Sequence, residues 1–266
     1  MKKHVTSIFL AIMPFSPVIF ADTSEGKYSL STGATYTSGD YGSQDTTELF
    51  YVPVSLKYKQ DKWSLKLTVP YIRIKGPQNV IQDIGQVSQS VATQSVVNEG
   101  LGDISVSANY QLFYLPKAKT VIDVTGKIKF GTADETKFLG TGKTDYSLST
   151  GLYKLMGDFT PYATLGRKFY GESAQFRLDD VYFSSLGLGY KVSSKTSLGA
   201  NFYWKDKTAS TRSATRELSS YLSYKLDTSW KLQAYLIRGL SDNTPDFGGG
   251  FSLAYELRAF KILCQV

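Results

Sequence analysis

The sequence of 266 residues contains one histidine and one cysteine, and both lie close to its ends. His4 lies in a predicted cleaved segment, so the mature chain has no histidine for a catalytic triad or a general base. Cys264 has no cysteine or histidine partner, which excludes an internal disulfide, an activated thiol and a His/Cys zinc site. Only a hydrolase built from paired carboxylates stays open, and nothing in the sequence supports it. We therefore expect no enzyme, no metal and no cofactor.

Long apolar runs are missing from all but the start of the chain. Residues 1–21 have two early lysines, an apolar stretch and a cleavage point after Ala21, which predicts a secretory signal peptide. An uncleaved anchor is the disfavoured alternative, because the apolar stretch is short and contains Pro14 and Pro17. No later segment approaches the roughly 18 apolar residues of a spanning helix. The sequence thus predicts an exported chain whose single mature domain covers residues 22–266.

Charge is not concentrated anywhere along the chain. The net charge of +7 is spread over the sequence, with no run of five or six like charges, so no nucleic-acid partner is expected. Tyrosine outnumbers phenylalanine, 19 to 15, and the mean hydropathy of −0.19 is low. This composition favours a membrane β-barrel, in which only alternate residues meet lipid.

Alternation of apolar and polar residues is clearest in residues 104–153. From Ile104 to Tyr114 every second residue is apolar, as in a strand with one apolar and one polar face. A short turn precedes a second alternating stretch over 122–130, and a long polar loop over 131–143 precedes a third over 145–153. Strand, short turn, strand, long loop and strand is the order typical of a transmembrane barrel.

The same plan extends over the whole mature chain. Short connections follow the even-numbered predicted strands and longer polar ones follow the odd-numbered strands, which places both termini in the periplasm. A soluble β-sandwich or jelly roll also alternates, but its connections would not alternate in length. We predict an all-β fold, an antiparallel up-and-down barrel in the outer membrane of a Gram-negative bacterium, with about twelve strands near 26–38, 48–59, 62–75, 104–114, 122–130, 145–153, 159–170, 179–191, 198–204, 218–226, 230–236 and 251–257. The facing of the strand over 159–170 is ambiguous.

Aromatic residues gather where the predicted strands meet the short turns. Amphipathic rings prefer the headgroup level of a bilayer, so these residues are predicted to form the inner aromatic girdle. They are Tyr58, Trp63, Tyr114, Tyr190, Tyr224 and Trp230.

Three glycine-rich stretches resemble one family of outer-membrane proteins. They are GLGD over 100–103, KFGTAD over 129–134 and GTGKTDYSL over 140–148. They resemble the family described as the meta-pathway of phenol degradation, most strongly over 100–170 and more weakly to Leu257. The resemblance implies a transporter of small hydrophobic or aromatic compounds. Most barrels end on an aromatic residue of the last strand, which the barrel-assembly machinery recognises. Here Tyr255-Glu256-Leu257 occupies the expected end of that strand, and Phe260 is the alternative recognition residue.

The inward faces of the predicted strands are mostly Ser, Thr, Gly, Asn and Gln, which indicates a hydrated interior. Lys57, Lys59 and Lys225 lie near strand ends and are expected to snorkel at the membrane interface. The charged residues expected to line the interior are Lys66, Asp123, Lys127, Lys205, Lys231 and Glu256.

Acidic residues recur at the outer start of descending strands. One hypothesis is a carboxylate ring that filters solutes at the external mouth, as charged rings do in other pores. The favoured alternative is that these carboxylates pair with neighbouring Lys or Arg or hold loops. The candidates are Asp103, Asp145, Asp179, Glu217 and Asp246.

The long segment over 76–100 is a second candidate at the external side. Val80, Ile84, Val87 and Val91 follow a helical spacing, and a helix folded inward would narrow the interior. Their β-branched side chains disfavour a helix, so a surface loop is the equal alternative.

Together these features predict a passive channel for small solutes, including hydrophobic or aromatic ones, whose partners are outer-membrane lipids, the assembly machinery and the solute. The alternative is a non-conducting barrel whose loops act as an adhesin or interaction surface.

Overall fold

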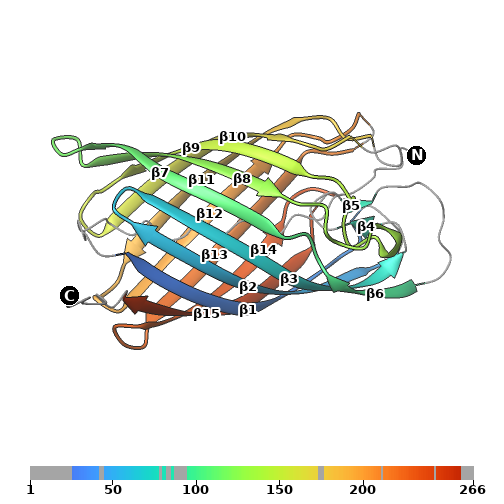
Figure 1. Cartoon of the computed structure of the whole chain (residues 1–266), viewed down its shortest axis with the longest axis horizontal. Helices are drawn as coiled ribbons and strands as arrows, with labels where there is room; N and C mark the ends of the chain where they lie inside the picture. Colours follow the sequence, from blue (N-terminus) through green and yellow to red (C-terminus); the bar gives the residue numbers. More distant parts are fainter. Residues whose placement is uncertain are drawn as a thin grey trace, which may run out of the picture.

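The computed structural model describes residues 26–41, 45–77, 80–81, 85–86, 95–172, 177–210, 212–242 and 244–258 (Figure 1). The predicted signal peptide and Phe260 lie outside the described residues.

The described chain consists almost wholly of strands. One 3-10 turn, η1 (Glu135–Lys137), is the only helical element among the described residues. The strands are β1 (Lys27–Gly39), β2 (Thr47–Gln60), β3 (Trp63–Pro77), β4 (Val80–Ile81), β5 (Gly85–Gln86), β6 (Ser95–Leu101), β7 (Ser105–Leu115), β8 (Thr120–Lys129), β9 (Asp145–Lys154), β10 (Phe159–Phe169), β11 (Val181–Lys191), β12 (Thr196–Lys205), β13 (Thr215–Lys225), β14 (Trp230–Gly239) and β15 (Phe247–Arg258).

The strands close into an antiparallel barrel. Each strand from β8 to β14 pairs with both of its sequence neighbours, β1 pairs with both β2 and β15, and β3 pairs with β2. β6 and β7 both pair with β3, one after the other, so they form a single wall strand interrupted at residues 102–104. The barrel wall therefore has twelve strands, which confirms the predicted fold class.

The two ends of the barrel differ in their connections, as predicted. Two to four residues link β2 to β3, β7 to β8, β9 to β10, β11 to β12 and β13 to β14. The other connections between successive wall strands are longer and gather at the opposite end, where Figure 1 shows β4, β5 and β6 on the right. We call these the inner and outer ends, because short turns face the periplasm in such barrels.

The outward face is apolar and carries aromatic residues near both ends. At the inner end Tyr58 packs against Trp63, with ring centroids 5.2 Å apart, and Trp230 packs against Tyr255 at 4.6 Å. At the outer end Tyr36 lies beside Phe247. Eight residues separate Phe50 from Tyr58, or about 26 Å along the strand and about 20 Å along the barrel axis at a tilt of about 40°, which is most of the roughly 25 Å apolar band of outer-membrane barrels. The predicted inner girdle is thus present.

A bulge changes one member of that girdle. The pairing of β7 with β8 shifts between Gln111 and Phe113, so Phe113 stands opposite Ile122 and Tyr114 opposite Val121. Ile122 faces outward and Val121 inward, because successive strand residues alternate between faces. Phe113 therefore takes the outward position that was predicted for Tyr114.

The outer segment between β3 and β6 does not begin as a helix. Val80 and Ile81 form β4, which pairs with β5, in keeping with their β-branched side chains. The helical spacing was therefore misleading at Val80, whereas Ile84, Val87 and Val91 lie outside the described residues. Within the part of the chain that the structure describes, no helix is long and apolar enough to span a membrane.

Candidate functional site

The interior of the barrel, the lumen, differs between its two halves. Towards the inner end most inward side chains are partly accessible to solvent, including Ser29, Ser107 and Gln233. Towards the outer end the inward side chains are buried, among them Thr35, Leu49 and Tyr203. Solvent therefore reaches the lumen from the inner end, and the outer end is packed. The two halves must be considered separately as sites.

The accessible half carries a group of lysines. Lys66 interacts electrostatically with both Lys57 and Lys127, and Lys231 interacts with Lys57, so β2, β3, β8 and β14 direct these four ammonium groups toward one region. We call Lys57, Lys66, Lys127 and Lys231 the lysine belt. Lys66, Lys127 and Lys231 occupy the lumen face, where the sequence placed them.

Lys57 is the member that the sequence interpretation misplaced. It was expected to snorkel outward at the membrane interface, but it stands directly opposite Lys66 in the β2–β3 pairing and shares its inward face. Alternation from the outward-facing Leu56 and Tyr58 gives the same answer. The alternation of apolar and polar residues in the sequence already indicates an inward Lys57. The position of Lys57 near the strand end instead suggested an interface residue. Lys59 and Lys225 have the same inward parity, at the inner rim.

Asp123 and Glu256 also face the inner half of the lumen. Asp123 accepts hydrogen bonds from the side chains of Asn109 and Tyr153 and from the backbone of Gly151. Glu256 forms an ion pair of 3.1 Å with Lys27 across the β1–β15 seam. Each carboxylate is therefore held by near neighbours on the wall.

Tyrosines form another part of the inner wall, in which Tyr162 and Tyr221 are buried and Tyr153 and Tyr235 are partly accessible. Tyr153 and Tyr162 stack with ring centroids 5.9 Å apart, and Tyr221 stands opposite Tyr235 in the β13–β14 pairing. Tyr162 donates a hydrogen bond of 3.1 Å to Asn201 Oδ1, which fixes the tilt of its ring. The four rings thus extend over β9, β10, β13 and β14.

Glycines allow these rings to lie against the wall. A Cβ atom at Gly187 would overlap the Tyr162 ring, and one at Gly199 would come within 2.7 Å of Tyr221 Cε1. The Tyr162 and Tyr221 rings therefore each cover a glycine of a neighbouring strand.

The outer half is closed by an apolar cluster. Tyr41 from the β1–β2 loop and Ala133 and Leu139 from the β8–β9 loop pack against Leu49 of β2 and the inward-facing Ile72 and Ile74 of β3. Leu49 is fully buried and Leu139 is 2% exposed. Sequence reasoning did not find this cluster, because loop residues such as Tyr41 and Leu139 carry no periodicity that would reveal inward packing.

The β8–β9 loop also contacts a second wall of the barrel. Phe138, next to Leu139, packs against buried Tyr170 and Val181 at the outer ends of β10 and β11. Tyr41 and Phe138 both adopt left-handed backbone conformations, with φ of 49° and 56°. Such conformations are costly for bulky residues and persist only where packing enforces them. Residues 130–144, which we call the mouth loop, thus reach over the outer mouth under strain.

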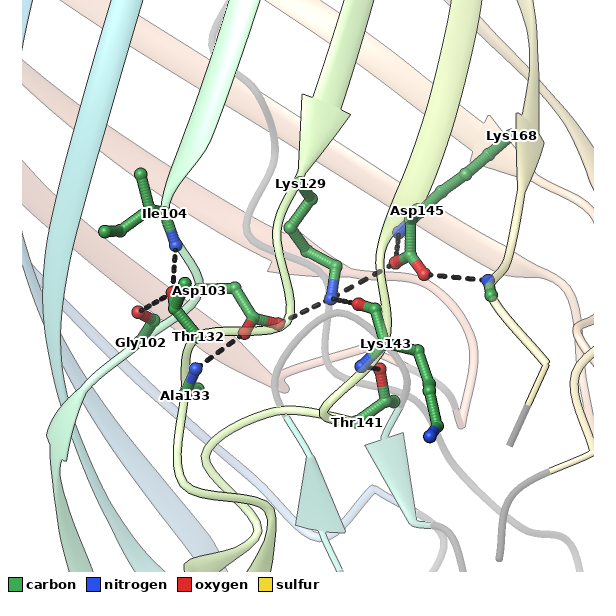
Figure 2. A network of polar contacts seen from close by, with 11 residues as sticks. Gly102, Asp103, Ile104, Lys129, Thr132, Ala133, Thr141, Lys143, Asp145 and Lys168 are labelled. Carbon is green, nitrogen blue, oxygen red and sulfur yellow. Dashed lines mark hydrogen bonds and ion pairs between the residues drawn. The ribbon is translucent and has the colours of Figure 1, made fainter. Parts of the chain in front are cut away.

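Ion pairs anchor the base of the mouth loop. Lys129 Nζ lies 2.5 Å from Asp103 Oδ2 and 3.3 Å from Asp145 Oδ2, and Lys168 Nζ lies 3.4 Å from Asp145 Oδ2. Figure 2 shows Lys129 between the two carboxylates. The backbone N–H of Ala133 donates to Asp103 Oδ1 at 2.9 Å, which ties the loop itself to the network. Asp103 and Asp145 therefore make the lysine pairs that the alternative to a carboxylate ring predicted.

The remaining ring candidates do not share one environment. Glu217 is fully buried on β13, diagonal to the buried Lys205 across the β12–β13 pairing. Asp179 and Asp246 are exposed in loops, and the carbonyl of Asp246 accepts a hydrogen bond from Arg238. The structure brings Asp103 and Asp145 together through Lys129. Among the described residues, no cluster of His, Cys, Asp and Glu is suited to hold a metal ion.

A closed twelve-stranded barrel, an apolar outward band between aromatic girdles and a polar interior define an outer-membrane β-barrel, located in the outer membrane of a Gram-negative bacterium. The chain belongs to the family described as "Putative MetA-pathway of phenol degradation", whose sequence profile matches residues 21–257. No curated protein sequence matches the chain.

Solved structures with similar folds share little sequence with the chain. The NanC porin superposes with a TM-score of 0.55 at 10% identity, over 87% of this chain and 100% of that one. The KdgM porin gives a TM-score of 0.52 at 12% identity, over 87% and 99%. The toluene transporter TbuX of Ralstonia pickettii gives 0.46 at 12% identity, over 90% of each chain. At these identities the first two comparisons establish the fold alone.

Proposed function

We propose that this protein is a passive outer-membrane channel for small solutes, with an outer mouth that the loops open and close. The observation that carries the proposal is the accessible inner half of the lumen, where polar and charged side chains such as Gln233 and Lys66 remain in contact with solvent. A barrel whose interior served only as a packed core would bury such groups. No catalytic step or cofactor belongs to this function.

Two further observations support transport. Tyr162 and Tyr221 pack against Gly187 and Gly199 of neighbouring strands, so their rings lie close to the wall. The family is described by a pathway of phenol degradation, and aromatic solutes suit a wall that presents the partly accessible rings of Tyr153 and Tyr235. We include small aromatic compounds among the solutes for this reason. The proposed surroundings are outer-membrane lipids, and the barrel-assembly machinery is the proposed partner during insertion.

The packed outer mouth implies gating. Leu139 and Phe138 of the mouth loop close the outer half on two sides, and the strained backbone at Tyr41 and Phe138 stores energy that loop opening would release. Conformations of this kind commonly occur in ligand clamps and switches. The described conformation therefore corresponds to the closed state of the channel.

Single-channel conductance of the refolded mature protein in a planar bilayer tests the proposal. Reproducible current steps, with openings separated by closed intervals, are expected. A folded barrel that shifts on gels after heating but never conducts would refute channel function and favour the alternative, a surface-interaction barrel. A variant in which the mouth loop is shortened separates a permanently filled lumen from a long-lived closed state, because only the second gains conductance.

A further inference from the structure

Charged side chains on the outward face of the barrel gather at one end of the wall. Alternation along the strands, anchored on outward residues such as Phe50, Leu218 and Leu236, gives outward parity to a group of charged residues near the outer end. They are Glu48, Arg73, Lys75, Glu99, Arg167, Arg216 and Arg238. At the inner end Lys154 is the only charged residue with outward parity within the described wall strands. The outer leaflet of the membrane therefore meets a charged surface that the inner leaflet does not.

Most of these outward cations have a carboxylate partner on the wall. The pairs, with the distance from nitrogen to oxygen, are Arg73 with Glu99 at 3.5 Å, Lys75 with Glu48 at 3.3 Å and Arg167 with Asp180 at 3.4 Å. Arg216 and Arg238 are the exceptions, because no carboxylate among the described residues lies within ion-pair distance of either guanidinium. Arg238 Nη1 donates a hydrogen bond of 2.7 Å to the carbonyl of Asp246, which leaves its other N–H groups and its charge available. We call Arg216 and Arg238 the arginine pair.

The two members of the arginine pair are neighbours on the wall. The backbone N–H of Leu240 donates to the carbonyl of Arg216 at 2.9 Å, and Arg238 stands opposite Leu218, so the arginines are diagonal partners across β13 and β14. Diagonal partners on one face lie about 7–8 Å apart, which lets two long side chains reach the same group. Both arginine side chains are exposed. An anion between them would receive hydrogen bonds from two guanidinium groups, each of which fits the oxygens of a phosphate.

The surroundings of the arginine pair are aromatic and aliphatic. Trp204 stands opposite one member, and Phe247, which is 55% exposed, stands opposite the other. Two positions closer to the inner end lie Leu218 and Leu236, whose exposed fractions are 46% and 68%. The arginine pair thus lies at the level of the outer aromatic girdle, next to the lipid-facing apolar band. A ligand that matches this surface has an anionic head and apolar chains.

We propose that the arginine pair is a binding site for a phosphate group of lipid A, the phosphorylated glycolipid anchor of the outer leaflet. The phosphate lies between the two guanidinium groups, and the acyl chains lie along the exposed leucines of β13 and β14. Arginine suits this role because its planar fork binds two phosphate oxygens at once, and because anionic lipids attract basic side chains at a membrane surface. The site is on the outside of the wall, so it does not depend on conduction through the lumen.

Native mass spectrometry of the refolded protein in neutral detergent micelles tests this site. Lipid A is titrated into the protein, and dephosphorylated lipid A, which keeps the acyl chains and loses the anionic head, is titrated in parallel. We expect the wild type to bind the phosphorylated lipid more tightly. This comparison uses the wild type alone, so it stands even if a variant fails to fold.

Substitution of the arginine pair locates the site. Arg216→Gln/Arg238→Gln should weaken the binding of lipid A by about fivefold for each charge removed and leave the binding of the dephosphorylated lipid unchanged. The matched control is Lys62→Gln/Lys117→Gln, which removes the same charge from two exposed turns at the inner end and should bind lipid A as the wild type does. Arg216→Lys/Arg238→Lys keeps the charge without the planar fork and should have an intermediate affinity. A heat-induced gel shift establishes that each variant folds.

Several results would overturn the lipid site. Equal affinity of the wild type for the two lipids would show that the acyl chains alone drive binding. An equal loss of affinity in the arginine variant and in the control variant would show that net charge attracts the lipid. Unchanged binding in the arginine variant, or no binding of lipid A by the wild type, would also refute the site and would leave the arginine pair as a surface for an anionic protein. None of these results bears on the channel, which the conductance measurement tests separately.

Discussion

Truncation of one side chain in the mouth loop should open the channel. Leu139 is 2% exposed and packs with Tyr41, Leu49, Ile72 and Ile74 at the outer mouth. Replacing a buried leucine with alanine costs about 2 to 5 kcal/mol. Because Leu139 lies on a loop, this cost falls on the closed arrangement of the loop more than on the strands that form the wall.

A loss of about 3 kcal/mol from the closed state raises the ratio of open to closed channels about a hundredfold. The assay is open probability in planar bilayers, recorded for Leu139→Ala and wild type under the same voltage and salt. The control is Leu165→Ala, which removes the same atoms from a position 62% exposed on the outward face of β10.

An unchanged open probability in a correctly folded Leu139→Ala barrel would refute the gating argument. It would mean that the apolar cluster at the mouth does not govern the passage of ions. An equal increase in Leu165→Ala would refute it as well, since the effect would then arise from barrel stability and not from the mouth loop.

Three further predictions concern the wall, the ion network and the mouth. Gly187→Ala should lower both conductance and thermal stability, since the new methyl group displaces the Tyr162 ring that covers Gly187. The control is Gly126→Ala, whose Cβ meets open space and which should change neither quantity in the same gel-shift and bilayer assays. Lys129→Met should lower stability by about 3 kcal/mol in denaturant titrations because it breaks a nearly buried network, whereas Lys75→Met, in an exposed pair, should stay within about 1 kcal/mol of wild type. Burial raises the pKa of the Tyr41 phenol above its ordinary value of 10.0, with the nearby carboxylates adding to the effect. The closed state is therefore fully stabilised below pH 10 and weakens as pH rises further, because the open state releases this proton first. Open probability should increase above pH 10 in the wild type and less in Tyr41→Phe, and an identical increase in both proteins would contradict this assignment.

Alternation of side chains was sufficient to predict the wall of the barrel. It predicted the twelve strands, the order of short and long connections and the inward facing of Lys66, Lys127 and Lys231, because strand geometry fixes every second side chain to one face. The same rule places Lys57 inward. The error there came from treating a strand-end lysine as an interface residue, although Tyr58 beside it was correctly placed outward.

Irregular features could not be predicted in the same way. The bulge near Phe113 adds one residue to β7 and reverses the facing of the residues after it. The sequence around Phe113 contains no residue pattern that would predict this bulge. The packing of Tyr41 and Leu139 against Leu49 depends on contacts between segments far apart in the chain. The hypothesis of a carboxylate ring assumed that acidic residues at the outer ends of the strands have the same environment. In the structure Asp103 and Asp145 share one lysine, whereas Asp179 is exposed in a loop.

The pairing of β1 with β15 has a consequence for how the chain is made and inserted. Lys27 stands in register with Arg258, so the first strand of the barrel receives its second neighbour only when the last strand arrives. Until then a partly assembled sheet has two open edges, each with a row of unpaired backbone groups that can recruit foreign strands. The chain must therefore be shielded through its whole passage across the periplasm. A chain that ended before Phe247 would never leave that vulnerable state.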